Sequence, residues 1–224
     1  MSLTFEYRGL GADPALSDYR ETWDYQREVH QQVADGARPG HVIFVEHAPV
    51  YTAGRRTKPE ERPFDGTPVV DVDRGGLITY HGPGQLVAYP IVALPDGVGV
   101  VDHVRHLESA VMALLADHGL ATQRVGGRTG VWLPADEHRP ERKICAIGVR
   151  VARRTTMHGL ALNVSSSAER FANIVPCGIA DAGVTSMAEE LGVDLAVADI
   201  ARELAPHLTR ELQDPPGHGG RLAR

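Results

Sequence analysis

The sequence predicts an α+β domain with a mixed, largely antiparallel sheet and flanking helices. Two amphipathic helical patterns, over residues 16–33 and 101–115, are each followed by several strand-like segments, without strict β-α alternation. The two longest strand-like segments, 143–151 and 155–164, are joined by Ala152-Arg153-Arg154, which is typical of an antiparallel hairpin. These observations favour this fold class over a doubly wound parallel sheet.

The elements expected in the first half of the chain are one helix and three strands. The first helix follows Pro14 and ends at Asp35-Gly36, where the apolar spacing stops. Residues 41–45, 69–72 and 86–92 are short apolar runs rich in β-branched residues, which predict strands. We expect a glycine-rich loop between the last two of these strands.

The second half begins with the clearest helix of the chain, which stops at Gly119. Short strands are expected near 122–125 and 130–133, followed by the hairpin. A capping box over residues 186–189 predicts a short helix that ends at Gly192. Apolar residues at helical spacing over 197–212 predict a last amphipathic helix.

Composition indicates an ordinary globular protein. Of the 224 residues, 42% are hydrophobic and 23% are charged, so we expect a single domain over residues 1–213. Residues 214–224 are rich in Pro and Gly and are expected to form a disordered tail. The start shows no secretory signal, and the longest apolar run, 86–94, is far shorter than the roughly 20 residues of a membrane span. We therefore expect a cytoplasmic protein that has reduced thiols and does not associate with a membrane.

The net charge of −6 argues against a general nucleic-acid-binding protein. Basic residues nevertheless gather within 55–62 and within 139–154. These groups are either solvated loop and strand surfaces or a local positive surface for an acidic protein partner. On the second interpretation, reversing the charges of Arg153 and Arg154 is expected to weaken the use of that acidic partner.

Two residues, Cys177 and Lys143, are the first candidates for catalysis. Cys177 lies in a Pro-Cys-Gly turn, which leaves the sulfur little steric cover on its glycine side. Of the 23 basic residues only Lys58 and Lys143 are lysines, so arginine supplies positive charge elsewhere. A guanidinium group does not lose its proton near neutral pH. Lys143 is therefore the first candidate for acid–base work.

The densest motif is the glycine-rich stretch 74–85, which contains four glycines. Glycines let the backbone approach a ligand closely and expose peptide N–H groups. The stretch lacks the Gly-Lys-Ser/Thr ending of a phosphate loop and the G-x-G-x-x-G pattern. It is predicted to line a ligand, and a plain hairpin connection is the structural alternative.

Cys145, His158 and a histidine pair at 103 and 106 allow both a structural and a functional interpretation. Cys145 shares a strand face with Lys143 and is a rival nucleophile, but its apolar neighbours favour packing. His158 is either a bonded structural residue or part of the site. His103 and His106 lie three apart on a helix without further ligands, which predicts a surface helix rather than a metal site. No metal or cofactor is expected.

Four motifs resemble the signatures of the lipoyl-pathway octanoyltransferases, also called the lipoate-protein ligase B family. They are residues 74–85 (RGGLITYHGPGQ), 143–148 (KICAIG), 158–164 (HGLALNV) and 174–178 (IVPCG), in family order over about 105 residues, and 49–54 extends the likeness. The resemblance implies the α+β fold of the biotin protein ligase and lipoate ligase catalytic domains. Cys145 departs from the family, which usually has a small residue such as alanine there.

The resemblance also implies an activity: transfer of an octanoyl group from acyl carrier protein to a specific lysine of a lipoyl domain, in protein lipoylation. The acceptors would be the lipoyl domains of the 2-oxoacid dehydrogenase and glycine cleavage complexes, and the enzyme is expected to be a monomer. Cys177 would carry the acyl thioester, and Lys143 would lower the pKa of that thiol and move protons. The implied substrate-binding residues are Arg74, Gly75, Gly76, Leu77, Ile78, Thr79, Tyr80, His81, Ala146, Ile147, Gly148, Gly159, Leu160 and Ala161.

Three other functions remain open at this point. An ATP-dependent lipoate or biotin ligase needs an adenylate-binding glycine loop and no cysteine, whereas here the loop continues as His-Gly-Pro-Gly-Gln. A cysteine thioester hydrolase would pair Cys177 with His81 or His158 and pass the acyl group to water. A non-catalytic module that binds carrier proteins would not need Cys177.

Overall fold

The computed structural model describes residues 2–10, 14–63, 66–174 and 182–213. Its main sheet is mixed and largely antiparallel, as predicted: β1–β2 and β9–β11 pair in parallel, and the other neighbours are antiparallel. In spatial order the strands are β1 (Leu3–Arg8), β2 (Gly40–Val45), β6 (Gln85–Ile91), β10 (Thr155–Asn163), β9 (Arg142–Ala152), β8 (Arg128–Leu133) and β7 (Gln123–Val125), with β11 (Gly183–Val184) beside β9.

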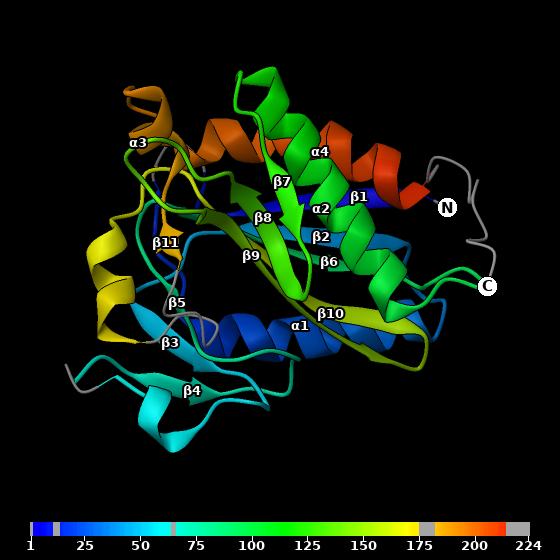
Figure 1. Cartoon of the computed structure of the whole chain (residues 1–224). Helices are drawn as coiled ribbons and strands as arrows, with labels where there is room; N and C mark the ends of the chain where they lie inside the picture. The colour runs from blue at the N-terminus through cyan, green and yellow to red at the C-terminus, as the bar shows by residue number, and fades with distance from the viewer. Residues whose placement is uncertain (1, 11–13, 64–65, 175–181, 214–224) are drawn as a thin grey trace, which may run out of the picture.

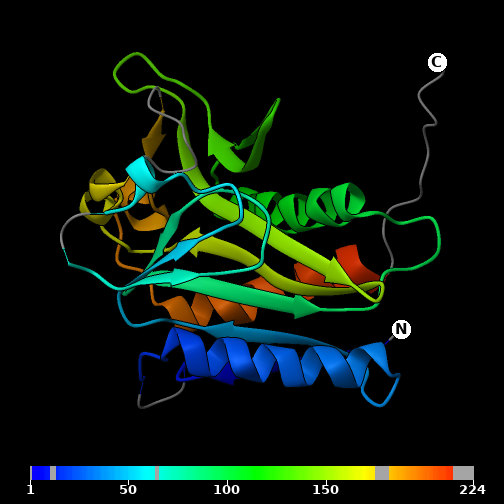
Figure 2. The same ribbon diagram turned by 90° about the horizontal axis from the view of Figure 1, so that it is seen from below.

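Helices cover both faces of this sheet (Figure 1). Helix α1 (Tyr19–Ala34) covers one face, and α2 (Val100–Asp117) and α4 (Val197–Gln213) cover the other, as the view from below also shows (Figure 2). Because successive side chains of a strand point to opposite faces, β2 serves both layers. Its Val42 and Phe44 pack with α2 and α4, and its Ile43 and Val45 pack with α1.

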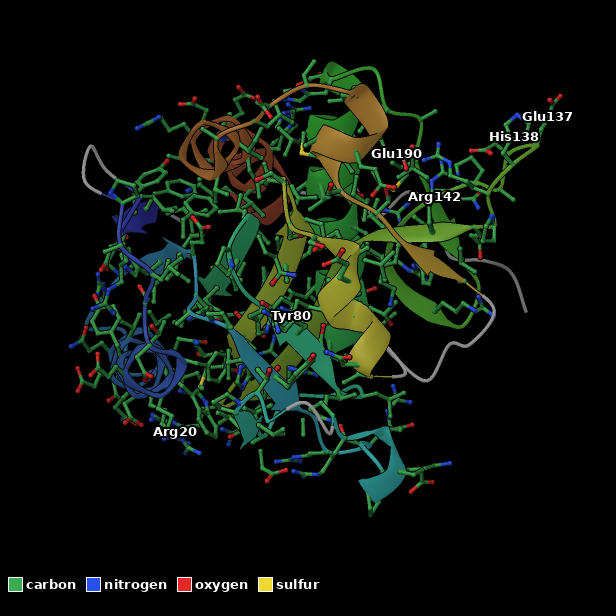
Figure 3. The ribbon with its side chains drawn as sticks, turned by 90° about the vertical axis from the view of Figure 1, so that its left-hand side faces the viewer. Arg20, Tyr80, Glu137, His138, Arg142 and Glu190 are labelled. Atoms are coloured by element: carbon green, nitrogen blue, oxygen red, sulfur yellow. The ribbon has the colours of Figure 1, made fainter. Side chains whose placement is uncertain are left out.

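A smaller sheet of three strands stands beside the main one. It consists of β4 (Val69–Asp71), β3 (Val50–Ala53) and β5 (Thr79–His81), with β3 parallel to β4 and antiparallel to β5. Two short 3-10 helices, η1 (Pro59–Glu61) and η2 (Ala168–Asn173), accompany this sheet. Phe171 of η2 packs edge-on against Tyr80, and Figure 3 shows η2 next to that residue.

The predicted helices and the hairpin are confirmed, and four strands were missed. Helix α3 (Met187–Leu191) follows the predicted cap and ends at Gly192 in a left-handed conformation. The missed strands are β1, β3, β5 and β11; they are two to six residues long, too short for a clear periodic pattern. The predicted strand near residue 69 belongs to the small sheet, and the expected tail lies outside the described residues. Within the described part of the chain, no helix combines the length and apolarity needed to cross a bilayer.

Gly84 allows the chain to pass tightly between β5 and β6. Its φ of +82° is left-handed, and its carbonyl accepts hydrogen bonds from the backbone N–H groups of Val164 and Ser165. A Cβ atom built on Gly84 would lie 2.6 Å from the backbone nitrogen of Ser166. Gly97 has a similar φ of +81° but nothing within 4 Å of such a Cβ. An alanine at Gly97 would therefore suffer backbone strain alone, whereas an alanine at Gly84 would suffer both strain and a steric collision.

We predict that Gly84→Ala lowers the free energy of unfolding by at least about 3 kcal/mol, because it adds a backbone collision to the strain of a left-handed alanine. The matched variant Gly97→Ala should lose only about 1 kcal/mol. Denaturant unfolding followed by circular dichroism measures both. Equal losses at the two positions would show that the close approach at Gly84 does not constrain the fold.

Candidate functional site

Eleven of the fourteen predicted substrate-binding residues line one narrow cavity of about 60 Å³, which we call the slot. Its walls come from the loop after β4, from β5, and from the middle of the β9–β10 hairpin. The apolar side chains of Leu77, Ile147 and Leu160 line it. The predicted residues that the structure brings together here are Arg74, Gly76, Leu77, Thr79, His81, Ala146, Ile147, Gly148, Gly159, Leu160 and Ala161.

The other three predicted residues lie elsewhere. Gly75 lines a neighbouring cavity. Ile78 and Tyr80 are buried in a separate cluster with Tyr51 and Phe171, on the side of β5 away from the slot. The physical reason is the two-residue period of a strand: Thr79 and His81 line the slot, so their neighbours face the other way.

Four residues of the slot were not predicted to bind substrate: Tyr19, Val87, Tyr89 and His158. The sequence indicates only that Tyr19 belongs to a helix and Val87 to a strand. For His158 it allows both a structural role and a role in the site. It has the positive φ of +60°, and its Nε2–H donates to Asp73 at 2.8 Å. This bond holds the chain just before Arg74 against β10.

Arg74 supports the slot through its own backbone loop. Its buried guanidinium donates to the carbonyl oxygens of Gly75, Leu77 and Thr52 and to Thr52 Oγ1, at 2.8–3.0 Å. The N–H of Gly75 donates to the carbonyl of Val149 on β9 at 3.1 Å. Arg74 therefore links two parts of the glycine loop to each other and joins the loop to β3. It also forms part of the slot wall.

The histidines next to the slot are held neutral. Burial, together with the neighbouring His47, lowers the pKa of His81 to about 3. Burial likewise lowers the pKa of His47 to about 4. Tyr19 stacks on His81 with ring centroids 5.9 Å apart, which keeps water from the imidazole. At neutral pH His81 therefore presents an uncharged ring to the cavity.

A continuous chain of buried hydrogen bonds, which we call the relay, runs from Arg74 to β9. Arg74 donates to Thr52 Oγ1, which contacts His81 Nε2 at 3.4 Å; His81 Nδ1 contacts Gln85 Oε1 at 2.7 Å. Gln85 Nε2 then donates to Asn163 Oδ1, and Asn163 Nδ2 donates to the carbonyl of Thr185, both at 2.9 Å.

The last acceptor of the relay, the carbonyl oxygen of Thr185, determines which atom donates in each preceding bond. The carbonyl of Thr185 only accepts, so Asn163 must present its amide nitrogen there and its oxygen to Gln85. Gln85 must then present its oxygen to His81, which fixes the imidazole proton on Nδ1. The N–H of Thr185 donates to the carbonyl of Lys143 at 3.0 Å. Three of the sequence motifs thus meet in one buried network.

Lys143 lies on β9, one residue from the buried ion pair between Arg142 and Glu190. Its side chain is 8% exposed, and its Nζ lies 4.6 Å above the ring of Trp132 on β8. Arg142 donates to both carboxylate oxygens of Glu190, at 2.6 and 2.8 Å, and Figure 3 shows these two side chains facing each other. Lys143 lines a second cavity of about 410 Å³ next to the slot.

Gly130 lets β8 come close to β9 beside Lys143. Its φ is +122°, and a Cβ atom there would lie 2.4 Å from the carbonyl oxygen of Cys145. The N–H of Gly130 donates to Oε1 of the buried Glu108 at 3.1 Å. The glycine thus permits a β-bulge at the point where Trp132 pairs with Lys143.

The two cysteines have different standing in the structure. Cys145 is fully buried in the main core, and burial raises the pKa of its thiol. This environment fits the packing role and not the rival nucleophile. Cys177 lies outside the described residues. The described residues that flank it in sequence lie beside the site. Before it, Ile174 packs with Ile78 and Tyr80; after it, Val184 pairs with Lys143.

The role of Arg153 and Arg154 in receiving an acidic partner stays a prediction, and the structure shows where the two residues lie. Both residues form the β9–β10 turn, ten residues from Lys143, or roughly 30 Å along an extended strand. Arg153 pairs with Asp35, and Arg154 pairs with Asp96 and donates to the carbonyl of Leu94. Their charges are paired and distant from the site.

Solved structures of lipoate ligases share this fold. A bipartite lipoate protein ligase from Thermoplasma acidophilum aligns with a TM-score of 0.71 at 16% identity, over 94% of this chain and 83% of that chain. Lipoate-protein ligase A bound with ATP aligns with a TM-score of 0.71 at 17% identity, over 94% of this chain and 85% of that chain. At this identity the likeness shows the fold, as the motifs had implied.

The sequence relatives are more similar. The octanoyltransferase of Cutibacterium acnes is 56% identical over 222 residues, which cover 96% of this chain and 82% of the relative. The octanoyltransferase of Pseudarthrobacter chlorophenolicus is 49% identical over 219 residues, 96% of this chain and 99% of the relative. The family model for the lipoyl protein ligase A/B catalytic domain matches residues 18–209. The chain therefore belongs to the lipoyl protein ligase A/B catalytic domain family and, within it, to the octanoyltransferases, which are acyltransferases.

Proposed function

We propose that this octanoyltransferase takes the octanoyl group from acyl carrier protein, holds it as a thioester on Cys177, and passes it to a specific lysine of a lipoyl domain. The observation that carries the proposal is the apolar slot directly beside Lys143: the two cavities share Gly76, Leu77, Ile147 and Gly148 as walls. An acyl chain in the slot would have its carbonyl end next to the one buried lysine of the described chain.

Chain geometry supports Cys177 as the acyl carrier. An extended chain advances at most about 3.6 Å per residue, so the Cα atom of Cys177 lies within about 11 Å of that of Ile174. Ile174 packs against Ile78, which precedes β5, and against Tyr80 of β5, a strand that also forms one wall of the slot. On the other side, Val184 is paired with Lys143. Both flanking segments lie beside the site, which supports the proposal that Cys177 is the acyl carrier.

The proposed first step is a thioester exchange. A free thiol with a pKa near 8.5 is only about 3% thiolate at pH 7, and a cation nearby increases this fraction. The Cys177 thiolate attacks the carbonyl carbon of the octanoyl donor; a new C–S bond forms, and the bond to the carrier sulfur breaks. The carrier thiolate leaves and takes a proton from the Lys143 ammonium group, which leaves Lys143 neutral for the second step. One thioester replaces another, so the step is nearly isoenergetic.

The second step consumes the acyl-enzyme. The neutral amine of the acceptor lysine attacks the acyl carbon, a C–N bond forms, and the C–S bond to Cys177 breaks. The amine loses one proton, which Lys143 accepts as the base. We propose the lipoyl domains of the 2-oxoacid dehydrogenase and glycine cleavage complexes as acceptors. The slot favours an unbranched acyl chain, because each buried methylene contributes about 0.8 kcal/mol.

We predict that mixing the enzyme with octanoyl carrier protein adds the mass of one octanoyl group to the protein. Intact mass spectrometry detects the adduct. Cys145→Ala should keep it, because that sulfur is buried in the core, and Cys177→Ser should lose the hydroxylamine-labile thioester. An adduct that persists in Cys177→Ser and disappears in Cys145→Ala would contradict the proposal.

A substitution by arginine separates the proton-accepting role of Lys143 from its positive charge, and Lys58, the other lysine of the chain, provides the control. Lys143→Arg keeps a cation but removes a group able to accept a proton, so we predict at least a hundredfold lower rate of transfer to a lipoyl domain. The matched variant Lys58→Arg, at an exposed position before η1, should retain full activity. A stopped-flow or gel-shift assay of lipoyl-domain octanoylation measures both. Full activity of Lys143→Arg would exclude Lys143 as the base.

A further inference from the structure

The cavity that contains Lys143 is wider than the slot and has a different character; we call it the groove. It lies between the first half of α2, the β7–β8 hairpin and the glycine loop; Figure 1 shows α2 and the β7–β8 hairpin side by side. Its apolar residues include Val100, Val101 and Val104 of α2. Its volume of about 410 Å³ is several times that of the slot.

Positive charge dominates the groove. Four cationic side chains line it, those of Arg56, Arg105, Arg128 and Lys143, against one carboxylate, that of Glu108. Glu108 is fully buried and already binds Arg105 at 2.6 Å and Arg124 at 2.9 Å. Arg105 is thus engaged by Glu108, and Arg128 lies 3.7 Å from a carboxylate oxygen of Glu141, so the charge that the groove offers to a ligand comes first from Arg56.

Arg56 contributes charge that the described chain does not neutralise. Its backbone N–H donates to Gly76, which fixes its position at the edge of the glycine loop. Its side chain is exposed and forms no ion pair with any described residue. An exposed arginine that lines a cavity without an acidic partner is available to an anionic ligand.

The rim of the groove is apolar. Val100 and Val101 are 46% and 66% exposed at the start of α2. Large apolar side chains left in water beside a charged cavity are typical of surfaces that contact another molecule. The groove therefore suits a ligand that carries a negative charge and is attached to a larger body.

We propose that the groove binds the phosphopantetheine arm of the acyl donor, with the phosphodiester between Arg56, Arg105 and Arg128 and the carrier protein on the valine rim. This inference rests on the proposed function. The shared walls of slot and groove then place the thioester at their junction: the acyl chain extends into the slot and the arm into the groove. Lys143 lies on the groove side of that junction.

The positive charge of the groove favours the acyl donor over the acceptor as its ligand. The acceptor presents a lysine, which is a cation in solution and is repelled by four cationic side chains. The donor arm carries a phosphodiester, an anion that the positive charge of the groove attracts. The acceptor therefore has to approach by another side of the junction, after the carrier has left the groove.

The test compares two charge reversals that change the net charge equally. Arg56→Glu alters the groove, and Arg20→Glu alters α1 on the opposite face of the sheet, where Figure 3 shows Arg20 on the outer surface. Arg20 is also exposed and unpaired among the described residues. The donors are octanoyl carrier protein, octanoyl-phosphopantetheine and octanoyl-pantetheine, which lacks the phosphate.

We expect Arg56→Glu to raise KM about tenfold at low salt for the two phosphate-bearing donors and less than twofold for octanoyl-pantetheine, with KM for the lipoyl domain unchanged. Arg20→Glu should leave all four values unchanged. Equal effects on all donors, equal effects of both variants, or a raised KM for the lipoyl domain alone would overturn the proposal.

A binding measurement keeps this test independent of the reaction. Fluorescence anisotropy compares carrier protein that has the arm but no acyl group with carrier protein that lacks the arm. We expect the arm to tighten binding at least fivefold in the wild type and in Arg20→Glu, and not in Arg56→Glu. If the wild type transfers no octanoyl group, the proposed function fails, and this comparison still decides whether the groove binds the arm. No effect of the arm on wild-type binding would overturn the inference.

Discussion

The relay of buried hydrogen bonds is the constraint on which the site depends. It begins at the Arg74 guanidinium, passes through Thr52, His81, Gln85 and Asn163, and ends at the strand pairing of Thr185 with Lys143. Each member is buried, so loss of any one leaves a neighbouring polar group without a partner, which costs about 1–3 kcal/mol. The same bonds hold the glycine loop, β5, β6, β10 and β11 in fixed register around the slot.

The relay also explains why polar side chains can surround an apolar cavity. The relay members hydrogen-bond to one another, and burial lowers the pKa values of His47 and His81 so far that both rings are neutral. The charge of Arg74 is bound to backbone carbonyls, and further positive charge lies in the groove, beyond the walls formed by Leu77 and Ile147. One side of the β9 strand can thus hold a hydrocarbon chain while the other attracts an anion.

Much of this arrangement could be predicted from sequence, because its parts are local. The β9–β10 hairpin follows from two long strand patterns, and the slot residues cluster within three motifs. The orientation of Ile78 and Tyr80 could not be predicted without knowing that β5 is a strand, since a loop has no alternating faces. Likewise, Tyr19 and Tyr89 carry no local signal, because only tertiary packing brings α1 and β6 to the slot. The paired state of Arg153 and Arg154 depends on partners more than fifty residues away in the chain.

The central claim is that the acyl chain occupies the slot while its carbonyl carbon lies between Cys177 and Lys143. A crystal structure of the octanoylated enzyme tests this most directly. The account predicts that the hydrocarbon contacts Leu77, Ile147 and Leu160, with Nζ of Lys143 within about 4 Å of the Cys177 sulfur or the acyl oxygen. An acyl chain in the arginine groove, or a sulfur on the far side of β9 from Lys143, would contradict it.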